Sequence, residues 1–588
     1  MALKPAHLQW SDDGGLRSLD FDDIYFQPGQ GPEESHYVFL KKNRLAERFQ
    51  ALQDDNFRIA ELGFGSGLNF LLTAQLWRKT APSSARLVYV SIEKHPVSSA
   101  DLKKLYSCWP EFQEHAALLL DRDVSDLLPE LTGHFDAWYL DGFSPAKNPA
   151  MWEEKLFPLL ASRTKPGGTL STFSSAGFVR RGLQQAGFIV EKITGFGAKR
   201  DMTVATMPAA ARPQPPQIKN VTILGAGVTG ATAAFALAQK GYQVTVLEQR
   251  QESAMDGSPG SPSGIVDPKF TVDASPAGSF HQHGFCFTLN LLKALKMSSW
   301  NPCGVVHLDI SEETGARHRA LINSGRWPEE FLRYEKTPSG MGIYAPLAGH
   351  LSPTEFCAIL LQHPLIKAVY STAVTSLDSL SGDAIIIALG NASNNFRETA
   401  WMPLQSLRGQ ITGIKENDLS RDIKTVICHE GYITPAVNGV HYIGATFQRE
   451  APATPEIRTE DDEENLVNLN MHLPTFGFSK REIVESHAGY RTTTPDKLPM
   501  IGACPDYEVF LELFAGLRNG KEGPATGKFI DKTFISTAVG SHGFTGAPLA
   551  GEIIASLVSG DPLPVPASLT KYLAPERYIF RDLKRGRI

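Results

Sequence analysis

The pattern of apolar and polar residues predicts a strand–helix–strand unit over residues 221–250. A β-branched apolar run leads into the turn GAGVTG, an alanine-rich helical stretch follows, and a second apolar run ends on Glu248. In such a unit Gly225 makes the tight turn, Gly227 lets the backbone approach a pyrophosphate, and Gly230 lets helix and strand pack closely. Glu248 stands about twenty residues on, where a carboxylate accepts hydrogen bonds from ribose hydroxyls. The pattern therefore predicts a dinucleotide-binding unit.

A second unit of this kind lies earlier in the chain. Residues 58–72, RIAELGFGSGLNFLL, read as a strand, a glycine-rich loop and a helix, and the next apolar run, LVYVSIEKHP, ends on an acid. The acid-led loop differs in spacing from GxGxxG and is typical of domains that bind S-adenosylmethionine (SAM); a second plain dinucleotide site is the alternative. The loop backbone would approach the methionine part of SAM, and the acid would hold its ribose. The predicted cofactor residues are Glu61, Gly63, Gly65, Gly67, Asn69 and Glu93.

A third apolar run, FDAWYL, ends at Asp141 in the sequence DGFSP. An alkyl amine accepts a methyl group only as the free base, and a carboxylate at the reacting centre can take the proton or orient the nitrogen. N-methyltransferases commonly place a D/N-P-P-aromatic motif at this position, from which Gly142 departs. We predict a catalytic or substrate-orienting role for Asp141, the alternative being a turn-capping aspartate. A rim for a bulky substrate is expected at Lys147, Asn148, Pro149 and Trp152.

Four segments in the C-terminal half follow the order of a flavin amine oxidase. After the unit at 221–250 come residues 257–270, ending in GSPSGIVDPKF, then LRGQI at residues 407–411 before a β-rich region, then AGYRTTTPDKLPMIG and finally VGSHGFTGAPLAGEIIASLVSG. Small residues permit close approach to a planar ring, and the last segment presents a helix N-terminus to the cofactor. The predicted FAD contacts are Ser263, Gly264, His542 and Gly543. For His542, hydrogen bonding to the backbone is the alternative.

Arg491, within the AGYR segment, is the candidate for binding a substrate carboxylate. Amino-acid oxidases need a fixed bidentate cation to orient the α-carbon hydrogen, and arginine supplies that fork. An ion-paired or surface arginine is the alternative. Arg408, in LRGQI, is a second and weaker candidate. The acidic run at residues 460–464 is interpreted as a solvated helix start.

Length and composition set the domain organisation. With 588 residues the chain is long enough for several domains. The predicted class is α/β: an N-terminal Rossmann-like SAM methyltransferase at residues 1–207, a proline-rich linker at 208–217, and an FAD-binding Rossmann domain with a β-rich substrate subdomain at 218–588. A net charge of −6 restricts any nucleic-acid partner to a local basic patch. Six scattered cysteines, no CxxC and no long apolar run predict a cytoplasmic protein without metal sites or membrane spans.

Together these motifs resemble the MnmC family of bifunctional tRNA-modifying enzymes. The resemblance rests on ELGFGSGLNF and LDGFSPAKNPAMW, followed by ILGAGVTG, GSPSGIV and AGYRTTTPDKLPMIG, and it covers essentially the whole chain. It implies that the FAD half oxidises 5-carboxymethylaminomethyl-uridine at the tRNA wobble position to the aminomethyl form, and that the SAM half then N-methylates the amine. We expect FAD to be bound non-covalently, tRNA to be the partner and the protein to be monomeric. Candidate phosphate contacts are Lys165, Arg180, Arg181, Lys199, Arg200 and the tail at 581–587.

Three other functions fit parts of the pattern. The same two activities could serve a free secondary amino acid such as sarcosine. A second alternative function is that of a non-catalytic RNA-binding scaffold whose nucleotide-binding folds have lost their activity, although the intact glycines, Glu93 and Glu248 argue against it. In a third alternative, only the methyltransferase half or only the oxidase half is active.

Overall fold

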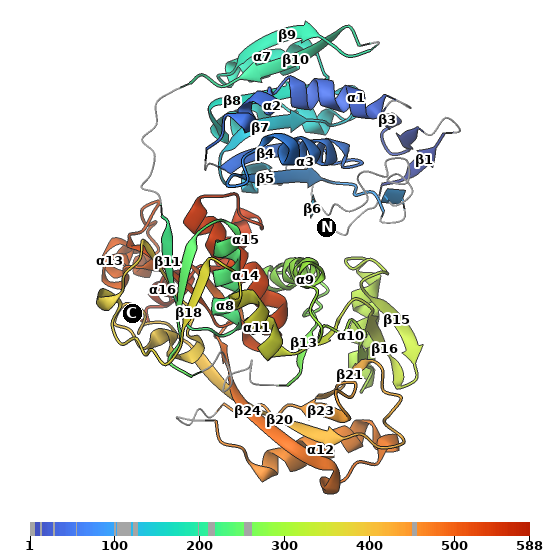
Figure 1. The fold of residues 1–588 in the computed structure, drawn as a ribbon, viewed down its shortest axis with the longest axis vertical. Helices are drawn as coiled ribbons and strands as arrows, with labels where there is room; N and C mark the ends of the chain where they lie inside the picture. Colours follow the sequence, from blue (N-terminus) through green and yellow to red (C-terminus); the bar gives the residue numbers. More distant parts are fainter. Residues whose placement is uncertain are drawn as a thin grey trace. The chain divides into compact units, whose positions relative to one another are not determined.

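The computed structural model describes most of the chain and divides it into two compact units (Figure 1). The described residues are 6–11, 15–26, 30–53, 56–98, 101–102, 119–121, 128–197, 199–209, 218–251, 262–449 and 455–588. The first unit comprises Met1–Pro216 with Gly560–Ala567, and the second comprises Gln217–Ser559 with Ser568–Ile588. Most of the predicted linker, at residues 210–217, lies outside the described residues, as do Cys108 and residues 257–261 of the predicted FAD segment.

The first unit is built on a seven-stranded sheet in the order β6-β5-β4-β7-β8-β10-β9. Its first five strands are parallel, and β10 is antiparallel to both of its neighbours. The strands are β4 (Asn56–Leu62), β5 (Arg86–Glu93), β6 (Leu119–Asp121), β7 (Phe135–Leu140), β8 (Thr164–Thr172), β9 (Ile189–Thr194) and β10 (Asp201–Thr206). The helices packed around it are α2 (Leu45–Gln50), α3 (Leu68–Thr80), α6 (Leu156–Ser162) and α7 (Gly177–Gln185).

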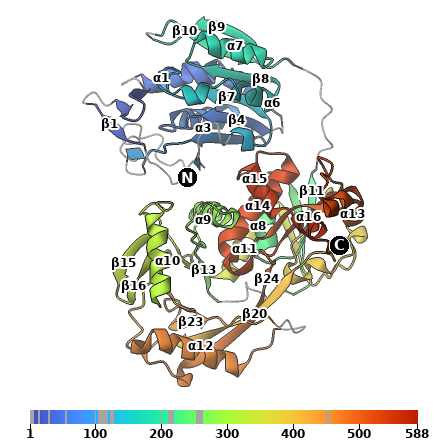
Figure 2. The same ribbon diagram turned by 180° about the vertical axis from the view of Figure 1, so that it is seen from behind.

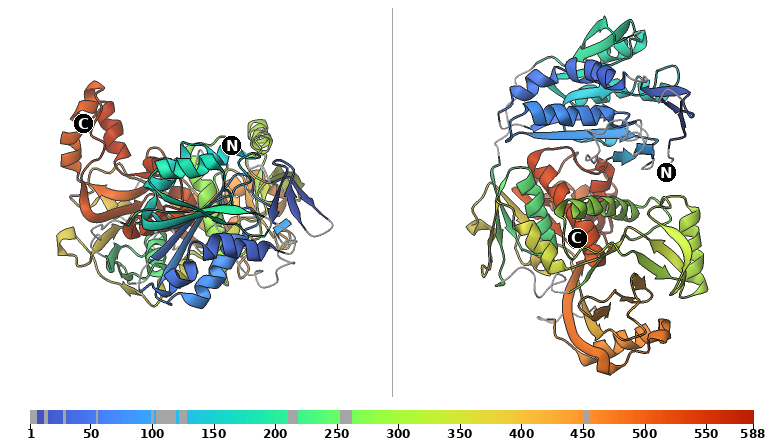
Figure 3. Two further views of the ribbon diagram at one scale, coloured as in Figure 1. Left: turned by 90° about the horizontal axis from the view of Figure 1, so that it is seen from above. Right: turned by 45° about the vertical axis from the view of Figure 1, so that its right-hand side comes forward.

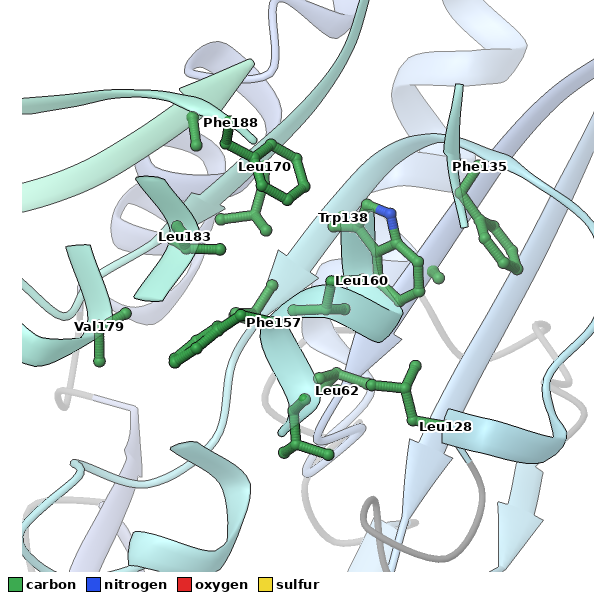
Figure 4. Packing of buried hydrophobic residues seen from close by; sticks show 14 of the residues in the cluster. Leu62, Leu128, Phe135, Trp138, Phe157, Leu160, Leu170, Val179, Leu183 and Phe188 are labelled. Carbon is green, nitrogen blue, oxygen red and sulfur yellow. The ribbon is translucent and has the colours of Figure 1, made fainter. Parts of the chain in front are cut away.

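Both faces of this sheet are buried, which explains the apolar run at residues 137–140 of β7. Trp138 and Leu140 pack into one cluster with Phe157 and Leu160 of α6 (Figure 4). Ala137 and Tyr139 point to the opposite face, into a second cluster. Because successive side chains alternate across a strand, a strand buried on both faces has no polar positions. The parallel sheet then brings the ends of β4, β5 and β7, with Glu61, Glu93 and Asp141, to one edge.

A small antiparallel sheet, drawn in dark blue in Figure 3, precedes β4 in the chain. It consists of β1 (Leu8–Trp10), β2 (Leu16–Ser18) and β3 (Asp23–Phe26), followed by α1 (Gly31–Ser35) and a π-helix at His36–Lys41. The ring of Tyr25 in β3 lies 3.0 Å from where a Cβ on Gly65 would stand. The chain before β4 therefore covers the loop that the sequence assigned to SAM.

The second unit contains a six-stranded sheet in the order β18-β12-β11-β19-β26-β25. Its strands are β11 (Asn220–Leu224), β12 (Gln243–Leu247), β18 (Ile366–Val369), β19 (Ala384–Ile387), β25 (Met500–Pro505) and β26 (Phe529–Thr537). Helix α8 (Val228–Gln239) packs against α14 (Gly543–Ser559) so closely that a Cβ on Gly551 would stand 2.7 Å from the Thr232 backbone. The predicted strand–helix–strand unit at 221–250 is present as β11, α8 and β12.

The β-rich region is an eight-stranded sheet in the order β15-β16-β14-β21-β22-β23-β20-β24 (Figure 2). Its strands are β14 (Val305–Leu308), β15 (Arg333–Thr337), β16 (Gly340–Ala345), β20 (Gln405–Lys415), β21 (Val426–Cys428), β22 (Tyr432–Ile433), β23 (Val440–Gly444) and β24 (Ile483–Thr493). A two-stranded sheet joins β13 (Gly264–Val266) to β17 (Gly349–Leu351). The remaining helices are α9 (Pro276–Leu295), α10 (Glu312–Asn323), α11 (Pro353–Leu361), α12 (Thr459–His472), α13 (Tyr507–Leu513), α15 (Ala567–Leu573) and α16 (Arg577–Lys584). No helix among the described residues is long and apolar enough to cross a membrane.

Candidate functional sites

The first unit contains a cavity at the edge where β4, β5 and β7 end. Its walls come from the glycine loop, from β3 and α1, and from the turn after β7. The predicted residues that line it are Gly63, Gly65, Asn69, Glu93, Asp141 and Asn148. Gly63 adopts φ 92° and packs against the next strand, because a Cβ there would stand 2.5 Å from the Asp141 carbonyl oxygen. Only glycine allows the loop and Asp141 to approach so closely.

Three polar side chains form a connected network at this edge. Asn69 Nδ2 donates hydrogen bonds to Glu61 Oε1 at 2.9 Å and to Asp141 Oδ2 at 2.7 Å. Ser35 Oγ, from the last residue of α1, donates to Asn69 Oδ1. Glu61 is fully buried, whereas Asp141 is partly exposed to the cavity. The sequence predicted Glu61, Asn69 and Asp141 separately; their shared amide and Ser35 were not predicted.

Burial changes the proton affinity of both carboxylates. It raises the pKa of Asp141 to about 7, against the Asn69 hydrogen bond, which acts to lower it. Burial, reinforced by the charge of Asp141, raises the pKa of Glu61 to about 8. A carboxyl group that titrates near neutral pH can act as a base and exchange its proton under physiological conditions. Asp141 therefore has the chemistry that the sequence assigned to it.

The acid at the end of β5 is held in a fixed orientation. Glu93 Oε2 accepts from the Gly65 backbone N–H at 3.0 Å, and Oε1 accepts from the N–H groups of Lys94 and His95 at 2.8 and 2.7 Å. A carboxylate has about four acceptor positions, so ribose hydroxyls can still bind. With a positive-φ glycine loop beside it, this edge fits a SAM molecule.

One expectation for this unit is corrected by the structure. Trp152 is 2% exposed and donates from Nε1 to the Phe143 carbonyl at 2.9 Å, so it belongs to the core rather than to a substrate rim. Lys199 lines the cavity, donates to Glu34 Oε1 at 2.8 Å and lies 4.2 Å from the Phe173 ring centroid. Its role as a phosphate contact stays a prediction. The aromatic wall of Phe21, Tyr25 and Phe143 was not predicted, because their spacing carries no motif.

In the second unit, the turn after β11 is shaped for a phosphate. Gly225 adopts φ 100°, and a Cβ on Gly230 would stand 1.9 Å from the Gly225 carbonyl, so both positions require glycine. A Cβ on Gly227, by contrast, would meet nothing within 4 Å. Open space at the N-terminus of α8 is where a pyrophosphate binds. Glu248 is 7% exposed, and its Oε2 accepts from the Ala226 N–H at 2.8 Å, which places its carboxylate beside the turn.

A cavity in the second unit is lined by both predicted FAD segments and by the eight-stranded sheet. Ser263, Gly264, His542 and Gly543 all line it. His542 Nδ1 lies 3.0 Å from the Asp267 carbonyl oxygen, so this ring is hydrogen-bonded to the backbone, which was the alternative interpretation. Burial lowers the pKa of His542. Ser263, Gly264 and Gly543 contribute little side-chain bulk to this lining, which allows a planar ring to approach the backbone. This cavity fits FAD together with a small reacting group.

Arg491 lines the same cavity, and its Nη1 donates to the Thr446 carbonyl oxygen at 3.4 Å. Among the described residues no carboxylate lies within ion-pair distance of it, although it lies against Gly409, where a Cβ would stand 2.6 Å from Nη1. Burial lowers the pKa of Arg491, yet a guanidinium stays charged in proteins. A partly buried guanidinium without a carboxylate partner among the described residues is chemically suited to bind an anion, and this role of Arg491 stays a prediction.

Arg408 does not share this role. It is fully buried and forms an ion pair with Asp461, and it also bonds Gln410 and Gln448. The run at 460–464 lies in the first turns of α12, and Glu460 and Glu464 are exposed as predicted, but Asp461 and Asp462 are only 2% and 7% exposed and are not solvated. Asp462 Oδ1 accepts from Thr412 and Gln410 of β20. These acids fasten α12 to the sheet.

Two further cavity residues were missed. His307 Nε2 lies 2.9 Å from Asp267 Oδ2, and both line the cavity. Asp267 falls within the GSPSGIVDPKF segment, where an acid among small residues was an available signal. His307 lies on β14, forty residues away, and nothing in the sequence joins the two.

Comparison with known proteins agrees with the division of the chain into a SAM-binding unit and an FAD-binding unit. Residues 98–208 match the family of S-adenosyl-L-methionine-dependent methyltransferases, and residues 220–557 match the family of FAD dependent oxidoreductases. The first match includes Asp141 but not the glycine loop. The chain is therefore a SAM-dependent methyltransferase fused to an FAD-dependent oxidoreductase.

Full-length relatives identify the family. The chain is 33% identical to the tRNA 5-methylaminomethyl-2-thiouridine biosynthesis bifunctional protein MnmC of Stutzerimonas stutzeri (strain A1501), covering 100% of this chain and 99% of the relative. It is 35% identical to the protein of that name from Chromobacterium violaceum, with the same two coverages. The chain belongs to the MnmC family of bifunctional proteins.

Solved structures agree with the fold of the oxidoreductase unit. Iminodiacetate oxidase from Chelativorans sp. BNC1 superimposes with a TM-score of 0.50 at 18% identity, covering 60% of this chain and 98% of that one. L-proline dehydrogenase from P. horikoshii gives a TM-score of 0.50 at 17% identity, covering 64% and 100%. At these identities the likeness concerns the fold alone.

Proposed function

We propose that this protein converts 5-carboxymethylaminomethyl-(2-thio)uridine at the tRNA wobble position into 5-methylaminomethyl-(2-thio)uridine in two steps. The full-length relatives described above are named for the biosynthesis of 5-methylaminomethyl-2-thiouridine in tRNA. The observation that carries the proposal is the uncompensated guanidinium of Arg491 in the cavity predicted for FAD. The carboxymethylamino group carries an amine and a carboxylate, as a secondary amino acid does. A guanidinium beside a flavin is therefore suited to bind its carboxylate.

The first step is an oxidation at the carbon between nitrogen and carboxylate. Arg491 binds the carboxylate and thereby fixes the direction of the α-carbon hydrogen. Bound FAD supplies a two-electron acceptor for the hydride. The substrate loses a hydride and the N–H proton and becomes an imine. Water then adds to the C=N bond, and cleavage gives a primary aminomethyl group and glyoxylate.

The second step transfers a methyl group to that amine. SAM supplies an electrophilic methyl group when bound. The nitrogen lone pair forms the new N–C bond as the S–C bond breaks, and the extra proton leaves the nitrogen. Asp141 can accept it, because its carboxylate lines the cavity and burial raises its pKa to about 7.

The rim of the oxidase cavity favours a large substrate over a free amino acid. Thr446, whose carbonyl accepts from Arg491, is followed by Phe447, which lines the cavity and is 58% exposed. A substrate the size of sarcosine would bind Arg491 and leave this ring in water. A uridine carried on the same carboxymethylamino arm can stack on it, as bases of single-stranded RNA do on aromatic side chains. For this the wobble uridine must leave the anticodon stack.

The test is mass spectrometry of wobble nucleosides from under-modified tRNA incubated with the protein. Aminomethyl-uridine should accumulate without SAM, and methylaminomethyl-uridine should form with SAM. Asp141→Ala should stop at the aminomethyl stage, whereas a variant that cannot bind FAD should still methylate tRNA that already carries the aminomethyl group. Unchanged carboxymethylaminomethyl-uridine in both incubations, with sarcosine oxidised instead, would reject tRNA in favour of the free amino acid.

A further inference from the structure

A buried amide links the two carboxylates of the methyltransferase cavity. Asn69 stands in the first turn of α3, Glu61 near the end of β4, and Asp141 directly after β7. The one Nδ2 nitrogen of Asn69 donates to both acids, at 2.9 and 2.7 Å. An amide nitrogen has two hydrogens, so this arrangement uses its full donor capacity.

The orientation of this amide is fixed by a fourth element. A carboxamide has similar dimensions at its oxygen and nitrogen, and a 180° rotation would point its oxygen at the acids instead. Ser35 Oγ donates to Asn69 Oδ1, which ties the oxygen to α1 and leaves the nitrogen toward Glu61 and Asp141. Ser35 and Asn69 are 6% and 4% exposed, so water does not substitute readily for either contact.

The network leaves one oxygen of Asp141 available. Its Oδ2 accepts from Asn69, whereas Oδ1 makes no hydrogen bond among the described residues, on a side chain that lines the cavity. The Asp141 backbone is also fixed, because its N–H donates to the Leu62 carbonyl at 3.0 Å and its carbonyl packs against Gly63. The carboxylate is held from one side and open on the other.

We infer that Asn69, oriented by Ser35, is a positioning residue for methyl transfer: it holds Asp141 with Oδ1 toward the amine and stabilises its ionised form. This inference rests on the proposed amine methylation and adds to it. Hydrogen bonds donated to a carboxylate favour the charged state. The neighbouring Glu61, whose pKa burial raises to about 8, stays largely protonated as Asp141 ionises, so the pair holds one negative charge near neutral pH.

The test is the pH dependence of kcat for methylation of aminomethyl-tRNA at saturating SAM. Titration of the substrate amine is common to all variants, so the comparison between variants isolates the enzyme group. Asn69→Ser removes both donors and should move the midpoint of the acidic limb upward by about one pH unit, a tenfold change in proton affinity. Ser35→Ala should move it in the same direction by less, since the amide loses only its anchor.

Thr73→Val is the matched control, because Thr73 lies one turn further along α3 and its buried hydroxyl contacts Tyr139 Oη at 2.9 Å, away from both acids. It should leave the midpoint in place. A fall in kcat for Asn69→Ser that is equal at every pH would overturn the inference. So would a loss of SAM binding in calorimetry with an unshifted midpoint, which would make Asn69 a cofactor contact only. If the wild-type protein methylates no aminomethyl-tRNA, the proposed function fails instead.

Discussion

Arg408 and Arg491 lie on neighbouring strands of one sheet and project from opposite faces. Arg491 of β24 pairs with Leu407 of β20, and Arg408 pairs with Tyr490, so the two arginines are one position out of register. Side chains alternate across a strand, and a single step therefore sends one guanidinium to α12 and the other to the cavity. The two cations consequently have different functions, which mutation can separate.

Replacing Arg491 should damage oxidation without unfolding the protein. Arg491→Ala removes the carboxylate-binding fork, and the loss of two charge-assisted hydrogen bonds should lower kcat/KM for carboxymethylaminomethyl-tRNA by roughly 10²- to 10³-fold. Stopped-flow reduction of bound FAD measures the effect, and methylation of aminomethyl-tRNA should be unchanged. An Arg491→Ala protein that oxidises at the wild-type rate would exclude the assigned role.

Arg408→Leu is the contrasting variant. It leaves the Asp461 carboxylate buried without its partner, which costs about 3–5 kcal/mol in comparable cases. A clear fall in thermal stability is expected, with any activity loss explained by unfolding. Unchanged melting would show that α12 does not depend on this ion pair.

The glycines of the FAD turn should respond differently to added side chains. Gly227→Val places its side chain in open space, so the protein should fold but bind FAD far more weakly, because a phosphate can no longer approach the backbone. Gly230→Ala forces a Cβ to within 1.9 Å of a carbonyl and should destabilise the unit itself. Flavin absorbance of the purified proteins and circular dichroism melting distinguish the two. Equal melting temperatures would contradict the contact geometry.

The raised pKa of Asp141 predicts a pH-dependent stability. An acid whose folded pKa is about 7 and whose ordinary value is 3.8 binds its proton more tightly in the native state. Stability therefore falls as pH rises between these values and is lowest above the folded pKa. Asp141→Asn removes the titrating group and should therefore stabilise the protein at pH 8 but not at pH 3.5. Each kcal/mol gained should raise the melting temperature by roughly 2–4 °C. Equal or lower melting at pH 8 would mean that Asp141 is not strained by burial.

The exposed ring of Phe447 should contribute to the binding of tRNA and not to the binding of a small amino acid. Phe447→Ala removes a stacking surface that is worth about 1–3 kcal/mol per base, so KM for tRNA oxidation should rise roughly 5- to 100-fold with little change in kcat. Phe447→Tyr keeps the ring and serves as the control. Any slow oxidation of sarcosine should be the same in all three proteins. A rise in KM for both substrates would point to a disturbed cavity.

Local motifs predicted the fold class and the two cofactor turns, because each turn is a short contiguous stretch. The glycines at 63–67 and 225–230 and the acids at 61, 93, 141 and 248 lie at or just after strand ends that hydrophobic patterning locates. Contacts across the fold could not be read in this way. Ser35 reaches Asn69, and Asp267 meets His307, only because separate elements fold together. The different environments of Arg408 and Arg491 depended on strand register, which neither residue's local sequence specifies.

The unbalanced positive charge of Arg491 has a consequence for turnover. Glyoxylate, the expected fragment of the first step, carries the same carboxylate that the guanidinium holds in the substrate. The cavity should therefore retain this product, and acetate or other small carboxylates in a buffer should compete with tRNA for the same position. The rate at which the anion departs would then govern how soon the next uridine can enter.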